Sequence, residues 1–291
     1  MTRSSARSHA SLPARGRSLL AILAVLAAGC AGLGTTDAGR GAAGDALEPV
    51  PEIAPGILAG YLEPQSLPDS VALLPPPPAE GSAAWALDLE ASERALALRG
   101  TPRWRLAAAD AVLHFPEAAG TWACALGAPI SEEHTPHLDR LLRRSLADAG
   151  LSTYAAKNHY QRARPFLTNG QPVCTPDDVE SLANDFAYPS GHSALGWAWA
   201  LVLAEVAPER GDAIVARGRA FGESRIVCNV HWRSDVVAGR FMGSATVARL
   251  HADPGFQEDV AAAKSELAAV RAAGLAIDRD CAAEADALAA E

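Results

Sequence analysis

The chain has 291 residues, of which 49% are hydrophobic and 20% are charged, and this length suffices for one large domain with a sizeable core. It carries 34 acidic and 25 basic side chains, and the formal net charge of −9 argues against binding nucleic acid through bulk electrostatics. Alanine-rich stretches recur and β-branched residues are sparse, so the composition predicts a mostly helical protein.

The N-terminal segment 1–29 combines four arginines, no acidic residue and an uncharged apolar run at 18–29. This pattern is typical of a secretory signal peptide, and the run is too short to span a bilayer. We therefore expect export to the periplasm. The residues before Cys30 resemble a bacterial lipobox, which predicts lipidation of Cys30 and a membrane-anchored lipoprotein. Ordinary cleavage that leaves Cys30 unmodified is the alternative.

The rest of the chain divides by composition into three parts. Residues 30–56 are rich in Gly, Ala and Pro, which predicts a flexible tether. Residues 57–262 are expected to form one all-α domain, a compact helical bundle. Residues 263–291 form a polar, alanine-rich C-terminal helical tail.

Apolar periodicity, capping residues and helix breakers predict the individual helices. The segment 193–206 is apolar around its whole circumference and too short for a membrane span, so it is expected to be the buried core helix. Residues 166–190 are expected to form a loop, and no strand-like alternation of useful length occurs. The other predicted helices cover 83–98, 104–114, 135–150, 152–164, 209–225, 232–251 and 256–273.

Four cysteines remain when Cys30 is set aside: Cys124, Cys174, Cys228 and Cys281. In an oxidising compartment they predict up to two disulfides. The sequence alone leaves all three pairings open.

Lys157 and Arg164 are the first candidate anion ligands. They are seven residues apart, which on a helix places both on one face, and Pro165 then ends that helix. The alternative is a solvated basic face that also includes Arg162.

The segment Ser190-Gly191-His192 directly precedes the predicted core helix. Free N–H groups and the positive end of the dipole make a helix N-terminus an anion site. Ser190 can cap the helix and donate its hydroxyl, and Gly191 allows the backbone to approach a ligand closely. A plain serine N-cap beside an incidental histidine is the alternative.

Arg225, His231 and Asp235 form the third candidate group. The four-residue spacing on a helix lets Asp235 hold one imidazole nitrogen of His231, which leaves the other free to attack a substrate. Arg225 offers a planar fork for phosphate oxygens. A structural His–Asp pair is the alternative.

Together the three segments resemble a known three-part signature, that of the type-2 phosphatidic acid phosphatase and vanadium haloperoxidase superfamily. The surrounding residues, such as those at 154–160 and 228–232, are similar to bacterial class A non-specific acid phosphatases. The resemblance covers about 60–262. The matching pattern is Lys157-x6-Arg164-Pro165, Pro189-Ser190-Gly191-His192 and Ser224-Arg225-x5-His231-x3-Asp235.

This resemblance implies an all-α fold and hydrolysis of small phosphomonoesters, with broad specificity, through a phosphohistidine on His231. Asp235 would orient His231, and His192 would protonate the leaving alcohol and then activate water. No metal and no cofactor are expected. The phosphoryl oxygens would be held by Lys157, Arg164, Ser190, Gly191 and Arg225.

Two other functions stay open at this stage. A vanadium-dependent haloperoxidase can use the same pocket, because vanadate mimics the phosphoryl transition state. A non-catalytic envelope lipoprotein that only binds an anion is the alternative without enzyme activity. The sequence also leaves open phosphotransfer to an alcohol as a side activity, homo-oligomer formation and the physiological substrate.

Overall fold

The computed structural model describes residues 47–290. The predicted signal peptide, Cys30 and residues 30–46 of the predicted tether lie outside the described part of the chain.

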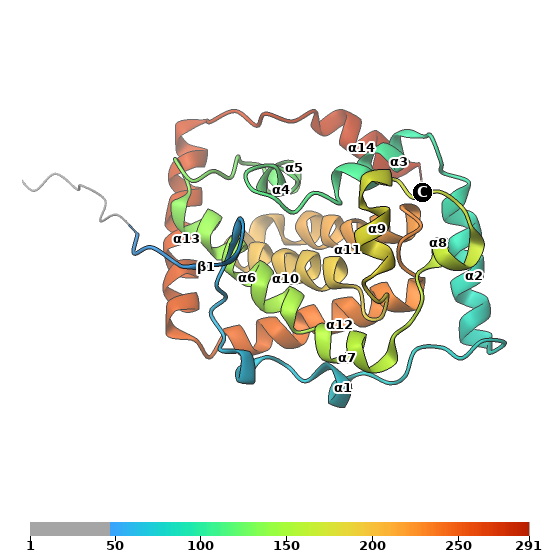
Figure 1. Ribbon diagram of the computed structural model, residues 1–291. Coiled ribbons are helices and arrows are strands. Elements are labelled where there is room, and N and C mark those ends of the chain that lie inside the picture. Colours follow the sequence, from blue (N-terminus) through green and yellow to red (C-terminus); the bar gives the residue numbers. More distant parts are fainter. Residues whose placement is uncertain (1–46, 291) are drawn as a thin grey trace, which may run out of the picture. The chain divides into compact units, whose positions relative to one another are not determined.

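Helix α10 (Gly191–Val206) lies at the centre of the fold, between α6 (Pro136–Leu151), α11 (Gly211–Val227) and α12 (Arg233–Leu250) (Figure 1). Its side chains Ala194, Ala198 and Trp199 are fully buried, as its uniformly apolar sequence predicts. Helix α13 (Pro254–Ala273) packs against α6. The predicted all-α fold is confirmed.

Small residues set the distance between α10 and α12. A Cβ atom added to Gly239 would lie 2.4 Å from the carbonyl oxygen of Ser190. One added to Gly243 would lie 2.4 Å from the carbonyl oxygen of Ala194. The two helix backbones therefore touch, and this contact places the N-terminus of α10 against the first turns of α12.

The remaining elements are short and surround this core. Polar side chains cap several of them: Ser82 Oγ accepts the N–H of Trp85 at the start of α2. The elements are β1 (Glu52–Ala54), β2 (Ile57–Leu58), η1 (Pro64–Ser66), α1 (Ser70–Leu73), α2 (Ala83–Leu96), α3 (Pro102–Ala109), α4 (Glu117–Gly120), α5 (Ala123–Leu126), α7 (Tyr154–Tyr160), α8 (Pro165–Asn169), η2 (Pro176–Asp178), α9 (Val179–Ala183), η3 (Pro208–Arg210) and α14 (Cys281–Ala289).

The helix predicted over 152–164 is shorter than expected, and this part of the prediction is wrong. α7 ends at Tyr160 because Gln161 adopts a left-handed conformation with φ of 50°. Arg164 is extended, as the residue before a proline prefers to be. Residues 166–190 are likewise more than a loop, since they contain most of α8 together with η2 and α9.

Two segments differ from the predicted boundaries. Strands β1 and β2 pair as an antiparallel hairpin, with Ala54 opposite Ile57, so the predicted tether overlaps an ordered element that was too short to show alternation. At the other end, α13 continues through residue 262, where the sequence placed the end of the domain.

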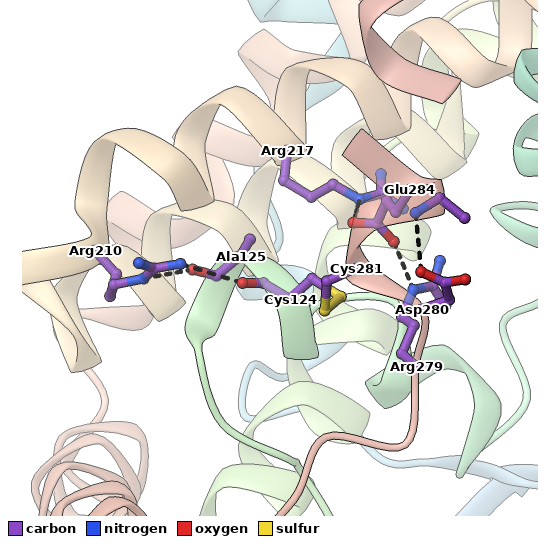
Figure 2. Close-up of a disulfide and its surroundings, with 9 residues drawn as sticks. Cys124, Ala125, Arg210, Arg217, Arg279, Asp280, Cys281 and Glu284 are labelled. Atoms are coloured by element: carbon purple, nitrogen blue, oxygen red, sulfur yellow. Dashed lines mark hydrogen bonds and ion pairs between the residues drawn. A yellow bond between two sulfur atoms is a disulfide. The ribbon is translucent and has the colours of Figure 1, made fainter. Parts of the chain in front are cut away.

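Two disulfides select one of the three pairings: Cys124–Cys281 and Cys174–Cys228. The first joins α14 to α5 (Figure 2). Beside it the guanidinium of Arg217 donates to Glu284 at 3.1 Å, which fastens α14 to α11 as well. The C-terminal helix is therefore tied to the domain by a covalent bond and a buried ion pair.

Candidate active site

One cavity of about 390 Å³ collects most of the residues that the sequence singled out. Its lining includes Lys157, Arg164, Gly191, His192 and His231, which come from α7, the segment before α8, the start of α10 and the turn before α12. The other three candidates are fully buried beside it: Ser190, Arg225 and Asp235. The structure thus brings together the three candidate groups from separate parts of the chain.

Lys157 and Arg164 converge, although they do not share a helix face as predicted. Lys157 Nζ lies 2.8 Å from Asp185 Oδ2, and Arg164 Nη2 lies 2.7 Å from the same oxygen. Both cations are almost completely buried. Burial and the neighbouring guanidinium of Arg164 lower the pKa of Lys157. A carboxylate that the sequence analysis did not single out therefore holds the two cations side by side.

The N-terminus of α10 is built as the sequence predicts. Ser190 caps the helix, because its Oγ accepts the backbone N–H of Ser193 at 3.2 Å. The N–H of Ser190 donates to the carbonyl of Asp235 at 3.0 Å, which fixes this turn to α12. His192 Nε2 lies 3.0 Å from the carbonyl of Ala111. A carbonyl only accepts, so Nε2 carries a proton.

His231 lies in the turn before α12. It is therefore not on a helix with Asp235, as the spacing suggested. Arg164 Nη1 donates to His231 Nε2 at 3.0 Å. A guanidinium only donates, so Nε2 accepts this bond with its lone pair and the proton of the neutral ring is on Nδ1. That Nδ1 lies 3.5 Å from Asp235 Oδ2 and makes no hydrogen bond among residues 47–290.

The predicted His–Asp hydrogen bond is not formed, and this prediction is wrong, because Asp235 also serves its own helix. It is the third residue of α12, and its Oδ2 accepts the N–H of Trp232 at 2.8 Å. This local bond holds the carboxylate at the start of the helix, with one oxygen turned toward the imidazole. The hydrogen bond from Arg164 nevertheless selects the tautomer of His231 that has its proton on Nδ1.

The charges around the two histidines favour their neutral forms. Burial and the guanidinium of Arg164 hold the pKa of His231 well below its ordinary value. Burial and the guanidinium of Arg225 do the same to the pKa of His192. Burial also raises the pKa of Asp235 to about 7, although the cation of Arg162 acts in the opposite direction. A neutral His231 retains the lone pair that a nucleophile needs.

Arg225 is buried with hydrogen-bond donors that residues 47–290 leave unused. It is 1% exposed, yet its Nε and Nη1 have no hydrogen-bond partner within the described residues. Burial and the neighbouring guanidinium of Arg164 lower its pKa to about 10. A buried guanidinium with unused donors is costly, so an anionic ligand at this position would relieve that cost.

Arg162 is a functional residue that the sequence analysis missed, because it appeared only as part of a solvated basic face. Its side chain is 8% exposed and pairs with both Asp235 and Asp88. The guanidinium carbon lies 5.4 Å from the ring centre of Trp85 and 5.5 Å from that of Trp232. The sequence held one indication of this buried ion pair. Asp88, the partner of Arg162, lies on the same helical stripe as the buried alanines at 91 and 95, so a buried carboxylate could have been expected there.

Comparisons with known proteins agree with this geometry. The model of the PAP2 superfamily matches residues 142–257, a range that contains all eight predicted site residues. The non-specific acid phosphatase of Providencia stuartii is 43% identical over 212 residues, which cover 72% of this chain and 86% of that protein. The chain belongs to the acid phosphatases of the PAP2 superfamily.

Two further relatives of this acid phosphatase extend the comparison. The acid phosphatase of Zymomonas mobilis is 42% identical over 70% of this chain and 77% of its own. The non-specific acid phosphatase of Salmonella typhimurium is 40% identical over 71% of this chain and 83% of its own. Within residues 47–290, no helix of this acid phosphatase is both long and apolar enough to cross a membrane.

Proposed function

We propose that this acid phosphatase hydrolyses small phosphomonoesters by transferring the phosphoryl group to Nε2 of His231. The observation that carries the proposal is the hydrogen bond that this nitrogen accepts from Arg164. An acceptor nitrogen carries no proton, so its lone pair can attack phosphorus once the bound substrate takes over the Arg164 donor. The bond from phosphorus to the ester oxygen breaks as the bond from phosphorus to Nε2 forms. Asp235 stabilises the imidazolium that results.

His192 is proposed as the proton donor to the leaving alcohol. Burial and Arg225 depress its pKa. A bound phosphate dianion adds negative charge among the same cations, so the pKa of His192 rises in the complex and the ring becomes protonated at acidic pH. After transfer, the neutral ring accepts a proton from the water that attacks phosphorus and releases phosphate and His231.

The phosphoryl oxygens are proposed to be held without a metal. Lys157, Arg164 and Arg225 supply the positive charge, and the Ser190 hydroxyl and the Gly191 N–H supply further donors. Asp185 holds Lys157 and Arg164 side by side. The same phosphohistidine can pass its phosphoryl group to an alcohol acceptor, which is the proposed side activity.

We also propose that the enzyme is exported to the periplasm after removal of residues 1–29. The two disulfides support this location because they persist in oxidising compartments. Lipidation of Cys30 would provide the membrane anchor. Fractionation of cells tests it, since a Cys30→Ala variant should move from the membrane fraction to the soluble periplasmic fraction.

Steady-state hydrolysis of p-nitrophenyl phosphate by the purified protein tests the proposed activity. We expect turnover that EDTA leaves unchanged and a bell-shaped pH profile with an acidic optimum. A His231→Ala variant should lose about a thousandfold or more of the activity. Oxidation of bromide by hydrogen peroxide with added vanadate, in the absence of phosphatase activity, would instead identify a haloperoxidase. Phosphate binding without any turnover would identify a binding lipoprotein.

A further inference from the structure

The cavity that contains the phosphate ligands has a second, apolar half. The cations, the histidines, Thr153 and Asp185 supply its polar lining, and the remainder is formed mainly by aliphatic side chains and one tyrosine. Three of these side chains are well exposed: Ile53 at 53%, Leu151 at 44% and Tyr154 at 48%. Ile57, Leu113 and Leu182 also belong to the apolar part of the lining.

The hairpin β1–β2 supplies Ile53 and Ile57, and α6 holds it in place. Arg144 Nη2 donates to the carbonyl of Gly60 at 2.8 Å. Asp148 accepts the N–H groups of Tyr61 at 2.9 Å and Leu62 at 3.0 Å. The segment directly after β2 is therefore anchored by two buried or half-buried side chains. The apolar wall is consequently a fixed part of the site.

Few polar groups in this cavity are free to recognise a hydroxylated alcohol. Thr153 donates its hydroxyl to the carbonyl of Gly150 at 2.7 Å. Oδ2 of Asp185 is engaged by Lys157 and Arg164. The polar atoms left to a leaving group are mainly Oδ1 of Asp185 and the hydroxyl of Tyr154. A sugar or glycerol group over the aliphatic side chains would therefore lose water and gain few hydrogen bonds, which is costly. An apolar group would instead bury its surface favourably.

We propose that this apolar half is the leaving-group subsite and that the enzyme selects phosphomonoesters of apolar alcohols, aryl or alkyl. The proposal rests on the proposed function. A phosphoryl group held between His231 and His192 directs its ester oxygen into the cavity that both histidines line, so the alcohol must extend over the same walls. Recognition by a mostly apolar pocket with a few polar anchors is the usual pattern for small ligands.

Paired substrates test this selection by kcat/KM. Phenyl and 1-naphthyl phosphate form an aryl pair, ethyl and hexyl phosphate form an alkyl pair, and glycerol 1-phosphate is the polar reference. Within each pair the leaving groups have similar acidity, so a difference reports binding of the apolar surface. We expect the larger member to exceed the smaller by about threefold or more in at least one pair, and glycerol 1-phosphate to be poorer than hexyl phosphate. The pair in which kcat/KM differs tells whether the subsite favours an aromatic or an aliphatic leaving group.

Ile53→Ser locates the effect, because this exposed side chain can be changed without disturbing the core. It should reduce the preference for the larger member by about threefold and leave glycerol 1-phosphate unchanged. Leu87→Ser is the matched control, since Leu87 is 50% exposed on α2 and does not line the cavity. Equal kcat/KM for both members of each pair, glycerol 1-phosphate hydrolysed as well as hexyl phosphate, or an Ile53→Ser variant that keeps the full preference would overturn the inference while leaving the phosphatase proposal standing. Failure to hydrolyse any of the substrates would overturn both.

Discussion

Arg162 donates a hydrogen bond to Oδ1 of Asp235, the carboxylate whose other oxygen faces His231 at 3.5 Å. The same guanidinium also donates to Asp88 at 2.7 Å. Asp88 in turn accepts the N–H of Ser234 at 2.8 Å, next to Asp235 in α12. Arg162 therefore holds the carboxylate in place and supplies the positive charge that opposes its protonation.

Replacing Arg162 with Gln should weaken catalysis most at acidic pH. Burial already raises the pKa of Asp235 to about 7, and loss of the cation removes an effect that lowers it. The pKa then rises further, so less of the ionised carboxylate remains below pH 7. We expect kcat/KM to fall by about tenfold or more near pH 5 and the acidic limb of the pH profile to move to higher pH.

Arg162→Lys should restore part of this loss because it returns the charge. Arg94→Gln is the control and should leave the pH profile unchanged, since Arg94 is 72% exposed and pairs only with Glu90 among the described residues. A profile of Arg162→Gln that is lower by the same factor at every pH would show that Arg162 has only a packing role.

Acidification should destabilise the folded enzyme through His231. Its pKa is depressed in the folded state, so the unfolded chain binds a proton that the folded chain excludes once the pH falls below about 6.5. The stability contributed by the neutral ring is present above this pH and is lost below it, by up to about 1.4 kcal/mol per pH unit. Chemical denaturation at pH 5, 6 and 7 measures the slope.

His231→Gln removes the titrating ring, so its unfolding free energy should fall less steeply than that of the wild type over the same interval. The comparison cancels the opposite contributions of Asp139 and Asp148, whose pKa values burial raises to about 6 in both proteins. Identical slopes would show that the folded environment does not depress the pKa of His231.

Gly239→Ala should lower both stability and activity. Its Cβ would lie 2.4 Å from the carbonyl oxygen of Ser190, so α12 must move away from the start of α10. Such overpacking costs about 1–3 kcal/mol, and here it displaces the turn that carries Ser190 and His192. Thermal unfolding and kcat/KM measure the two effects.

Gly211→Ala provides the control, because nothing lies within 4 Å of the Cβ that it adds at the start of α11. It should keep full activity. A Gly239→Ala enzyme with wild-type stability would show that the α10–α12 contact is less tight than described.

The two disulfides should affect different properties. Cys174–Cys228 ends three residues before His231, so a Cys174→Ser/Cys228→Ser variant should lose both stability and activity. Cys124–Cys281 fastens α14 far along the chain from the site, so its double serine variant should lose stability alone. Each loss should be about 2–5 kcal/mol by the loop-entropy model. Denaturation under non-reducing conditions and p-nitrophenyl phosphate turnover separate the cases, and equal effects on activity would contradict this division.

The features that the sequence predicted correctly depend on local patterns. The core helix follows from the almost entirely apolar run at 193–206, and the cap at Ser190 follows from its position shortly before that run. The end of α7 was missed because Gln161 carries no marker of a left-handed conformation. Because this helix end was missed, Lys157 and Arg164 were incorrectly placed on one helix face.

Long-range partners had no local signal. Asp185 bridges Lys157 and Arg164 from a separate segment, and the charge on Arg162 is buried only because Trp85 and Trp232 enclose it. The first strand of the hairpin, at 52–54, was assigned to the tether because two strands of this length are too short to alternate visibly. Its place in the cavity depends on Arg144 and Asp148 of α6, which no pattern near residue 53 reveals.

The central claim is that His231 becomes covalently phosphorylated, and trapping of that species tests it most directly. A His192→Ala variant should accumulate it with p-nitrophenyl phosphate, because this leaving group departs without a proton donor while water attack lacks its base. Alkaline quenching followed by peptide mass analysis should then place one phosphoryl group on His231, and none in the His192→Ala/His231→Ala double variant. An unmodified His231 in an enzyme that still turns over substrate, or a phosphoryl group on another residue, would contradict the account.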